Sequence, residues 1–331
     1  MALLEISDLN IEVVTGSGVL HAVRGIDLAV NAGETLCIVG ESGCGKSLMA
    51  LSITGLLPPV ARCSATRLAF EGHDIQHLSR RELEDLRGKG IGFIFQDPMT
   101  GLNPTMTIGR QLMEVHLRHV GRDREAAKTA AVSFLTRVGI ANAATRLRQY
   151  PHELSGGLRQ RVMIAMALMA HPRLIIADEP TTALDVTIQA QVLSLLKSLQ
   201  REHGIGLVFI THDLGVVAAI ADRVAVMYAG EVVETGDARD VLADPRHPYT
   251  RALISCVPST TPSPAGVSVE LGTIPGRVPL LHGRIEGCAF APRCALVRDR
   301  CSTETVPARP AGAVEICRCL FAIEKREFFH A

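Results

Sequence analysis

The sequence feature that most constrains the fold is a glycine-rich octapeptide near the amino terminus. Residues 40–47 read Gly-Glu-Ser-Gly-Cys-Gly-Lys-Ser, which matches the P-loop pattern G-x-x-x-x-G-K-[ST] in full. Its glycines allow the backbone to curl so that successive N–H groups point at phosphate oxygens. One apolar run, Thr35–Val39, precedes the loop, and another, Leu48–Leu57, follows it. A strand, a phosphate loop and a helix in this order predict an α/β fold that binds a nucleotide.

The side chains of this loop have separate expected roles. Lys46 is expected to reach the β- and γ-phosphates of the nucleotide, and Ser47 is expected to bind Mg²⁺. The amino terminus of the following helix adds the positive end of its dipole. The predicted nucleotide-binding residues of the loop are Gly40, Glu41, Ser42, Gly43, Cys44, Gly45, Lys46, Ser47 and Leu48.

A second apolar strand ends in two acidic residues. Leu174–Ala177 is followed directly by Asp178 and Glu179. We expect Asp178 to hold the Mg²⁺ shell and Glu179 to polarise the attacking water. An apolar run that ends in Asp-Glu is more often an ordinary strand edge, but its presence together with a P-loop favours a catalytic site.

Short apolar runs alternate with helix-forming segments along most of the chain. Leu4–Val14, Ile26–Val30 and Gly206–Thr211 are predicted to be strands. Strands that alternate with helices indicate a mostly parallel sheet that is covered on both faces.

The bulk composition excludes several classes of protein. The 331 residues are 47% hydrophobic, and 34 basic residues balance 34 acidic ones. Nucleic-acid-binding proteins are usually basic, and the 4% aromatic content offers few surfaces for base stacking, so no nucleic-acid partner is expected. The amino terminus lacks the basic region of a secretory signal, and Pro58 and Pro59 interrupt the longest apolar stretch. We therefore expect a soluble protein, or one that a partner holds at a membrane.

A third segment is similar to the signature motif of ATP-binding-cassette (ABC) ATPases. It reads Leu-Ser-Gly-Gly-Leu-Arg-Gln-Arg at residues 154–161 and precedes an apolar helix at residues 162–170. Gln96 resembles the Q-loop glutamine of that family, residues 183–185 resemble its D-loop, and His212 resembles its switch histidine. The motifs occur in the order typical of the family. The resemblance therefore implies an ATPase that uses ATP and Mg²⁺.

The resemblance also implies that two such domains share their catalytic sites. In this family two cassettes pack head to tail and trap two ATP molecules between them. The signature residues of one subunit would face the γ-phosphate that the other subunit's P-loop holds. Gln96 would sense Mg²⁺ and the γ-phosphate, and His212 would orient Glu179 and the water. The implied catalytic residues are Lys46, Glu179 and His212; the further nucleotide contacts are Gln96, Ser155, Gly156, Gly157, Asp178 and Asp185; the Mg²⁺ contacts are Ser47, Gln96 and Asp178.

The sequence departs from the ABC pattern at two positions. ABC proteins usually stack adenine on an aromatic residue upstream of the P-loop, but no Phe, Tyr or Trp precedes Phe70. Leu20 or His21 would have to cover the base, with a weaker contact. Cys44 stands where Ser is common, but this position contributes its backbone, so we expect function to survive.

The chain resembles one branch of the ABC family in particular, the dipeptide/oligopeptide permeases. The segments that carry this resemblance are residues 95–99, 103–104, 177–191 and 245–250. It implies a P-loop core with a mixed sheet in residues 1–245, with a helical subdomain at about residues 97–165 that carries the signature motif. A small irregular C-terminal domain is implied for residues 246–331.

Membership of this branch implies an ATPase subunit that powers the import of di- or oligopeptides at the cytoplasmic face of a bacterial inner membrane. Such a subunit needs two transmembrane permease subunits, a second ATPase subunit and, indirectly, an extracytoplasmic solute-binding protein. The ATPase pair can be a heterodimer or a homodimer. Related subunits also serve nickel and other small solutes. A non-transport ABC protein is disfavoured because the chain has neither a coiled-coil insertion nor a second cassette, and intact catalytic motifs disfavour a purely regulatory partner.

The C-terminal part holds six of the nine cysteines. Some subunits of this branch carry a [4Fe–4S] cluster on a similar set, and four thiolates are the right ligands for one. A zinc site, which lacks its usual C-x2-C knuckle here, and unligated cysteines are the alternatives. We expect the group to lie at the periphery, because it is far in sequence from the ATP motifs. The predicted ligands are Cys288, Cys294, Cys301 and Cys317, with Cys319 as a substitute for Cys317.

Overall fold

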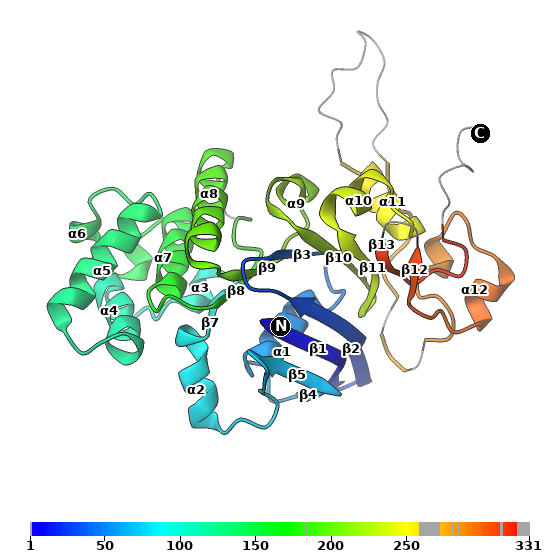
Figure 1. Ribbon diagram of the computed structural model, residues 1–331, viewed down its shortest axis with the longest axis horizontal. Coiled ribbons are helices and arrows are strands. Elements are labelled where there is room, and N and C mark those ends of the chain that lie inside the picture. Colours follow the sequence, from blue (N-terminus) through cyan, green and yellow to red (C-terminus); the bar gives the residue numbers. More distant parts are fainter. Residues whose placement is uncertain are drawn as a thin grey trace, which may run out of the picture.

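Two β-sheets form the centre of the molecule (Figure 1). The structure is a computed structural model that describes residues 2–182, 184–257, 272–279, 281–283, 285–311 and 314–322. The larger sheet has the strand order β12-β13-β11-β10-β3-β9-β8-β7. Its strands are β3 (Thr35–Val39), β7 (Ile91–Ile94), β8 (Leu174–Asp178), β9 (Gly206–Ile210), β10 (Arg223–Tyr228), β11 (Glu231–Asp237), β12 (Arg309–Ala311) and β13 (Val314–Cys317).

The larger sheet is parallel at its centre and antiparallel at one side. β10, β3, β9, β8 and β7 run parallel, whereas β11 pairs antiparallel with β10 and with β13. Alternate residues of β3 enter different apolar cores, with Cys37 and Val39 on one face and Leu36 and Ile38 on the other. Burial on both faces explains why these strands are continuous apolar runs in the sequence. The predicted mixed sheet is confirmed.

One face of the larger sheet packs against α1 (Lys46–Ile53) and a smaller antiparallel sheet. α1 ends earlier than the predicted Leu57, because Gly55 takes a left-handed φ of 61° directly after the helix. Met49 and Ile53 of α1 are fully buried there. The smaller sheet has the order β2-β1-β5-β6, with β4 beside β1. Its strands are β1 (Leu4–Thr15), β2 (Gly18–Val30), β4 (Ala61–Ser64), β5 (Arg67–Phe70) and β6 (His73–Asp74).

Helices cover the opposite face of the larger sheet. In Figure 1 the green helices at one end of the molecule include α4, α5 and α7, which contact one another. Among the described residues no helix is both long enough and apolar enough to cross a bilayer. The helices are α2 (Arg80–Lys89), α3 (Pro98–Gly101), α4 (Ile108–His119), α5 (Arg124–Arg137), α6 (Ala143–Arg146), η1 (Pro151–Glu153), α7 (Gly156–Leu168), α8 (Val186–His203), α9 (Leu214–Ile220), α10 (Ala238–Ala243), α11 (Pro248–Ser255), η2 (Ala291–Arg293) and α12 (Asp299–Thr303).

The C-terminal segments join the main fold. β13 extends the larger sheet by pairing with β11, where Cys317 lies opposite Glu234. Leu281 and Phe290 are buried in the same apolar core as the helices. These side chains share the core of the larger sheet, so this part of the chain does not depend on an apolar core of its own. The division into domains at residue 245 stays a prediction.

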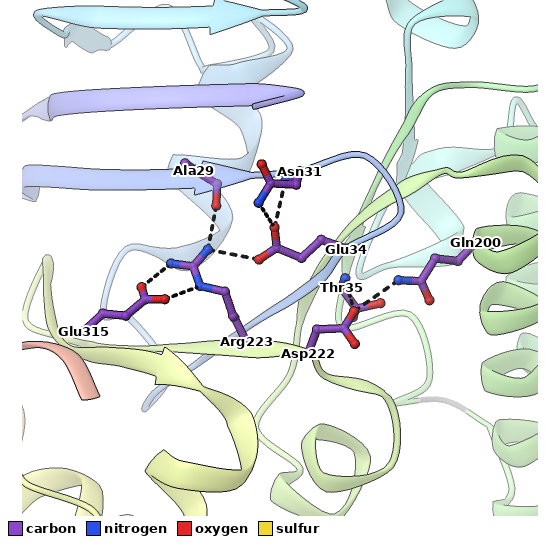
Figure 2. A network of polar contacts seen from close by, with 8 residues as sticks. All are labelled: Ala29, Asn31, Glu34, Thr35, Gln200, Asp222, Arg223 and Glu315. Atoms are coloured by element: carbon purple, nitrogen blue, oxygen red, sulfur yellow. Dashed lines mark hydrogen bonds and ion pairs between the residues drawn. The ribbon is translucent and has the colours of Figure 1, made fainter. Parts of the chain in front are cut away.

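An ion-pair network fastens β13 to the rest of the molecule (Figure 2). Arg223 at the start of β10 donates to both carboxylate oxygens of Glu315, at 3.0 and 2.5 Å. Its Nη1 also donates to the carbonyl oxygen of Ala29 and to Glu34, each at 3.0 Å. Two-pronged contacts of this kind are the stronger form of ion pair. The network therefore links one of the last strands to both sheets.

Candidate functional site

The glycine-rich loop joins the carboxyl end of β3 to α1, and two of its glycines cannot carry a side chain. Gly40 has a φ of 156° and Gly45 a φ of 100°. A Cβ on Gly40 would lie 2.2 Å from the carbonyl oxygen of Met227, and one on Gly45 would lie 2.3 Å from that of Ala22. Both the backbone conformation and the space therefore require glycine. Strands β10 and β2 thus press on the loop and fix its shape.

Lys46 folds back over the loop. Its ammonium group donates to the carbonyl oxygens of Gly40 at 2.8 Å and Glu41 at 2.9 Å. The side chain is buried, and the Sγ atom of Cys44 lies 3.5 Å from the same nitrogen. Phosphate oxygens can replace the two neutral carbonyls, because a hydrogen bond between two charged groups is stronger.

Asp178 and Ser47 form an oxygen-lined corner beside the loop. Asp178 ends β8, its carboxylate is buried, and its Oδ1 atom has no hydrogen-bond partner among the described residues. Burial raises the pKa of Asp178, and a hydrogen bond from Ser47 opposes this shift. A buried carboxylate oxygen without a partner, next to a hydroxyl, fits a divalent cation that prefers oxygen ligands. The residues present therefore fit the expected Mg²⁺.

Glu179, Gln96 and His212 converge at the carboxyl ends of three parallel strands. The Oε2 atom of Glu179 accepts a hydrogen bond from Nε2 of Gln96 at 3.2 Å and lies 3.4 Å from Nδ1 of His212. These residues follow β8, β7 and β9, which are neighbours in the larger sheet. Adjacent parallel strands thus bring together side chains that lie 83 positions apart in the case of Gln96 and Glu179.

Two further contacts hold Glu179 in place. Its φ is 44°, a region that residues other than glycine rarely adopt. Its backbone N–H donates to the carbonyl oxygen of Ile210 at 3.0 Å, which anchors this conformation. Thr182, which was not predicted from the sequence, donates from its hydroxyl to Oε2 of Glu179 at 3.2 Å. The carboxylate therefore has a fixed direction, as a catalytic group needs.

The signature segment forms an exposed helix start. Ser155 is the N-cap of α7 but makes no side-chain capping hydrogen bond, and Ser155 and Gly156 are exposed. A Cβ on Gly156 would meet nothing within 4 Å. Figure 1 shows α7 toward one end of the molecule and α1 nearer its centre. The N–H groups at this helix start are therefore open to solvent, and they suit an anion.

The remaining predicted nucleotide contacts lie in two other places. Asp185 caps α8 by accepting a hydrogen bond from the backbone of Ile188 at 3.0 Å, while Ala183 lies outside the described residues. The two residues predicted to cover adenine lie beside the C-terminal segment. His21 donates from its backbone to Leu281 at 2.8 Å, and Leu20 forms a bridge with His282.

Comparison with known proteins agrees with this geometry. The sequence profile of the ABC transporter family matches residues 23–182, and that of the oligopeptide/dipeptide transporter C-terminal region matches residues 233–301. The oligopeptide transport ATP-binding protein OppD of Bacillus subtilis is 53% identical over 292 residues, which cover 88% of this chain and 81% of that protein. The chain belongs to the ABC transporter family.

Other relatives of this ABC ATPase are similar over most of its length or over the cassette. The dipeptide transport ATP-binding protein DppD of Escherichia coli is 48% identical over 304 residues, which cover 92% of each chain. Among solved structures, the dimeric ATP-binding cassette MJ0796 with ADP and phosphate has a TM-score of 0.65 and 29% identity. It matches 71% of this chain and 99% of that one. The predictions of the P-loop fold and of ATP hydrolysis are confirmed.

Residues of the C-terminal part reach the P-loop of this ABC ATPase, which the sequence did not indicate. Nη1 of Arg293 donates to both carboxylate oxygens of Glu41, each at 3.0 Å. The hydroxyl of Tyr249 accepts a hydrogen bond from the backbone N–H of Glu41 at 3.0 Å. Arg293 directly precedes Cys294, so the cysteine segment is not remote from the ATP motifs. The peripheral position of the cysteine group itself stays a prediction, but the neighbouring Arg293 contacts a P-loop residue 252 positions away in the sequence.

The cysteines gather around a small cavity in this C-terminal part. The structure favours Cys319 over Cys317 as the fourth member of the group, because Cys317 does not line this cavity. Cys317 is instead buried in β13. No group of three or more His, Cys, Asp or Glu side chains in the described part of the chain is arranged to hold a metal ion. The thiols that line the cavity are Cys288, Cys294, Cys301 and Cys319.

Proposed function

We propose that this ABC ATPase hydrolyses Mg-ATP to power the import of dipeptides or oligopeptides through a membrane transporter. The observation that carries the catalytic part is the convergence of Gln96, Glu179 and His212 beside the P-loop. The substrate class is supported by relatives that are named as oligopeptide and dipeptide transport proteins and that match most of their length. The match of the transporter C-terminal region supports the same assignment.

In this proposal Glu179 receives the proton of the attacking water. Its Oε2 atom is occupied by Gln96, Thr182 and His212, so the second carboxylate oxygen can accept a hydrogen bond from the water. His212 and Gln96 then act by holding this carboxylate in line with the γ-phosphate. The fixed backbone of Glu179 removes the need to reorganise it during the reaction.

The P-loop residues bind the phosphates. The ammonium group of Lys46 moves from the loop carbonyls to the β- and γ-phosphate oxygens, and the loop N–H groups from Gly40 to Leu48 surround them. Ser47 and Asp178 would hold Mg²⁺. Gln96 would sense this Mg²⁺ from its place beside the Glu179 carboxylate. Magnesium, when bound with ATP, neutralises charge on the phosphates.

We also propose that the chain acts as one of two ATPase subunits. Ser155, Gly156 and Gly157 would complete the site of the second subunit, and Asp185 would lie at the same interface. The exposed start of α7 and the dimeric form of the similar cassette MJ0796 support this arrangement. Two transmembrane permeases and an extracytoplasmic solute-binding protein would complete the transporter, with this chain on the cytoplasmic face of the inner membrane. The second subunit would be a related chain or a copy of this one.

The cysteine group is proposed to bind a [4Fe–4S] cluster. In a tetrahedral zinc site, Zn–S bonds of about 2.3 Å place the sulfurs roughly 3.8 Å apart, whereas a four-iron cube separates its thiolates more widely. Four thiols line one cavity, yet the described residues contain no group arranged for a single ion. The number and type of thiols that share this cavity support a cluster held by four thiolates. The proposed ligands are Cys288, Cys294, Cys301 and Cys319.

Uptake measurements in cells test the transport function. Cells that lack the chain should lose uptake of labelled di- or oligopeptides, and wild-type chain, but not Glu179→Gln, should restore it. Nickel uptake measured in the same cells separates the alternative substrate. Affinity purification from detergent-solubilised membranes should recover two permeases and a second ATPase. Unchanged peptide uptake together with a chain that recovers no membrane protein would contradict the transport proposal.

A further inference from the structure

Glu41, the second residue of the P-loop, is held through all of its polar groups. Its carboxylate accepts two hydrogen bonds from Arg293, its backbone N–H donates to Tyr249, and its carbonyl oxygen accepts from Lys46 at 2.9 Å. The first two partners come from the C-terminal part of the chain. Lys46 is the phosphate-binding lysine itself. A single loop residue therefore connects the C-terminal part to the group that must move onto ATP.

Arg293 is a rigid partner for this loop. Its side chain is only 4% exposed, and its guanidinium also donates to the carbonyl oxygens of Pro275 at 2.8 Å and Ile274 at 3.2 Å. It lies over the ring of Tyr228, 5.8 Å from the centroid. A buried arginine with this many fixed acceptors loses little further freedom when it holds Glu41. The contact is thus more ordered than a surface ion pair between two mobile side chains.

Packed aromatic rings support the same contact. Tyr228 and Tyr249 lie with their ring centroids 4.6 Å apart, and Phe290 lies 5.2 Å from Tyr228 and 5.3 Å from Tyr249. Tyr228 follows Met227, whose carbonyl oxygen presses on Gly40 of the loop. The chain has no Trp and only three Tyr, so two of its three tyrosines are placed at this junction. The junction therefore supports the loop from both the sheet and the C-terminal side.

We propose that Arg293 is a positioning residue for the P-loop, and that the C-terminal part thereby sets the affinity of the site for ATP. Arg293 neutralises the Glu41 carboxylate, which would otherwise repel the triphosphate, and holds the loop in the shape that binds it. The proposal rests on the proposed function for the identity of the ligand. It predicts that a change at Cys294, the next residue, alters the affinity of the site for the nucleotide.

Measurements of nucleotide binding to the full-length chain test whether Arg293 sets the affinity for ATP. Arg293→Ala should weaken the binding of a fluorescent ATP analogue by about tenfold, because it leaves a carboxylate beside the phosphates without its partner. Arg293→Lys should recover part of the loss, since it restores the charge. Arg277→Ala is the matched control: Arg277 is an exposed arginine of the same part of the chain and should change nothing. All variants are compared at a temperature at which circular dichroism shows each to be folded.

A double-mutant cycle tests whether Arg293 acts on ATP binding through Glu41. Glu41→Gln removes the charge that Arg293 neutralises, so Arg293→Ala combined with Glu41→Gln should bind ATP more tightly than Arg293→Ala alone. A lower unfolding temperature for Arg293→Ala with unchanged ATP affinity, or effects that simply add in the double variant, would overturn the proposal and leave the ATPase function intact. Failure of the wild-type chain to bind ATP would refute both.

Discussion

Single residues carry the catalytic assignment, and the two acids at the end of β8 show how differently neighbours can be used. Asp178 is buried with one oxygen unpartnered, as a cation ligand would be. Glu179, the next residue, turns into a left-handed conformation and meets Gln96 and His212. The left-handed backbone of Glu179 directs the two consecutive side chains to different places, so the proposed metal binding and water activation would fall to separate residues.

The first prediction concerns Glu179. Glu179→Gln should keep ATP binding but lower turnover in the assembled complex by about 10²-fold or more, because an amide cannot accept the proton of water. Lys46→Ala, in contrast, should lose binding itself. Turnover is measured as phosphate release, with the second ATPase site disabled. A Glu179→Gln complex that hydrolyses ATP at the wild-type rate would remove this residue from the mechanism.

These residues could be singled out from the sequence because their motifs are local and follow strands that are apolar on both faces. Contacts between residues that are far apart in the sequence are different, because no local motif indicates them. Nothing near Arg293 indicates Glu41, and Thr182 gives no signal apart from its place after the acidic pair. Long-range side-chain pairs of this kind follow from the packing of the C-terminal part, which its Pro-rich sequence does not specify.

At the scale of elements, some strand boundaries follow from the local apolar pattern and others do not. β3 and β8 begin where their apolar runs begin, since both of their faces are buried. β2 starts at Gly18, well before the predicted Ile26, because β1 pairs with it through several register shifts that interrupt the alternation of apolar residues. The apolar pattern therefore predicts the centre of the fold better than its curved outer sheet.

The second prediction concerns the start of α7. Ser155→Arg should leave nucleotide binding to this chain intact but block ATP-driven closure with the partner subunit, because a long side chain would fill the open approach to the helix start. Closure is measured by crosslinking of the two subunits with and without ATP. A variant that still crosslinks on addition of ATP would show that the signature motif does not complete the partner's site.

The third prediction concerns the entry to α11. Glu234 in β11 is fully buried and accepts hydrogen bonds from the backbone N–H groups of Arg246 at 2.6 Å and His247 at 3.0 Å. Glu234→Ala should lower the free energy of unfolding by roughly 2–4 kcal/mol, because it deprives two N–H groups of this acceptor. Glu234→Gln keeps one acceptor oxygen and should cost less. Equal unfolding midpoints in urea for the wild type and the alanine variant would contradict this role.

At the scale of the whole molecule, the chain is less clearly divided than its sequence indicates. The last strands belong to the same sheet as the P-loop strand, and the cysteine segment contacts the loop through Arg293. A metal group in that segment would therefore lie within the same folded unit as the ATP site. The identity of the fourth cysteine ligand of this metal group therefore tests how the segment is arranged.

The fourth prediction concerns that ligand. Protein purified without oxygen should be brown and contain roughly four iron and four sulfide per chain, as expected for a [4Fe–4S] cluster. Cys319→Ser should remove the colour, whereas Cys317→Ser should keep it, because Cys317 lies away from the cavity. Absorption spectra and iron analysis show whether each of the two variants still holds the cluster. Stoichiometric zinc without sulfide would establish a zinc site instead, and loss of iron only in Cys317→Ser would restore the first ligand set.

The pairing of β11 with β13 also has a consequence for synthesis of the protein. β11 ends at Asp237 and β13 begins at Val314, 77 residues later (314 − 237). At roughly 5–20 residues per second, a ribosome needs about 4–15 s to make this stretch. During that time the nascent chain presents β11 as an unpaired edge, to which other chains could add. A stop codon between these two strands would leave that edge open permanently, so truncated products should aggregate even when every ATP motif is complete.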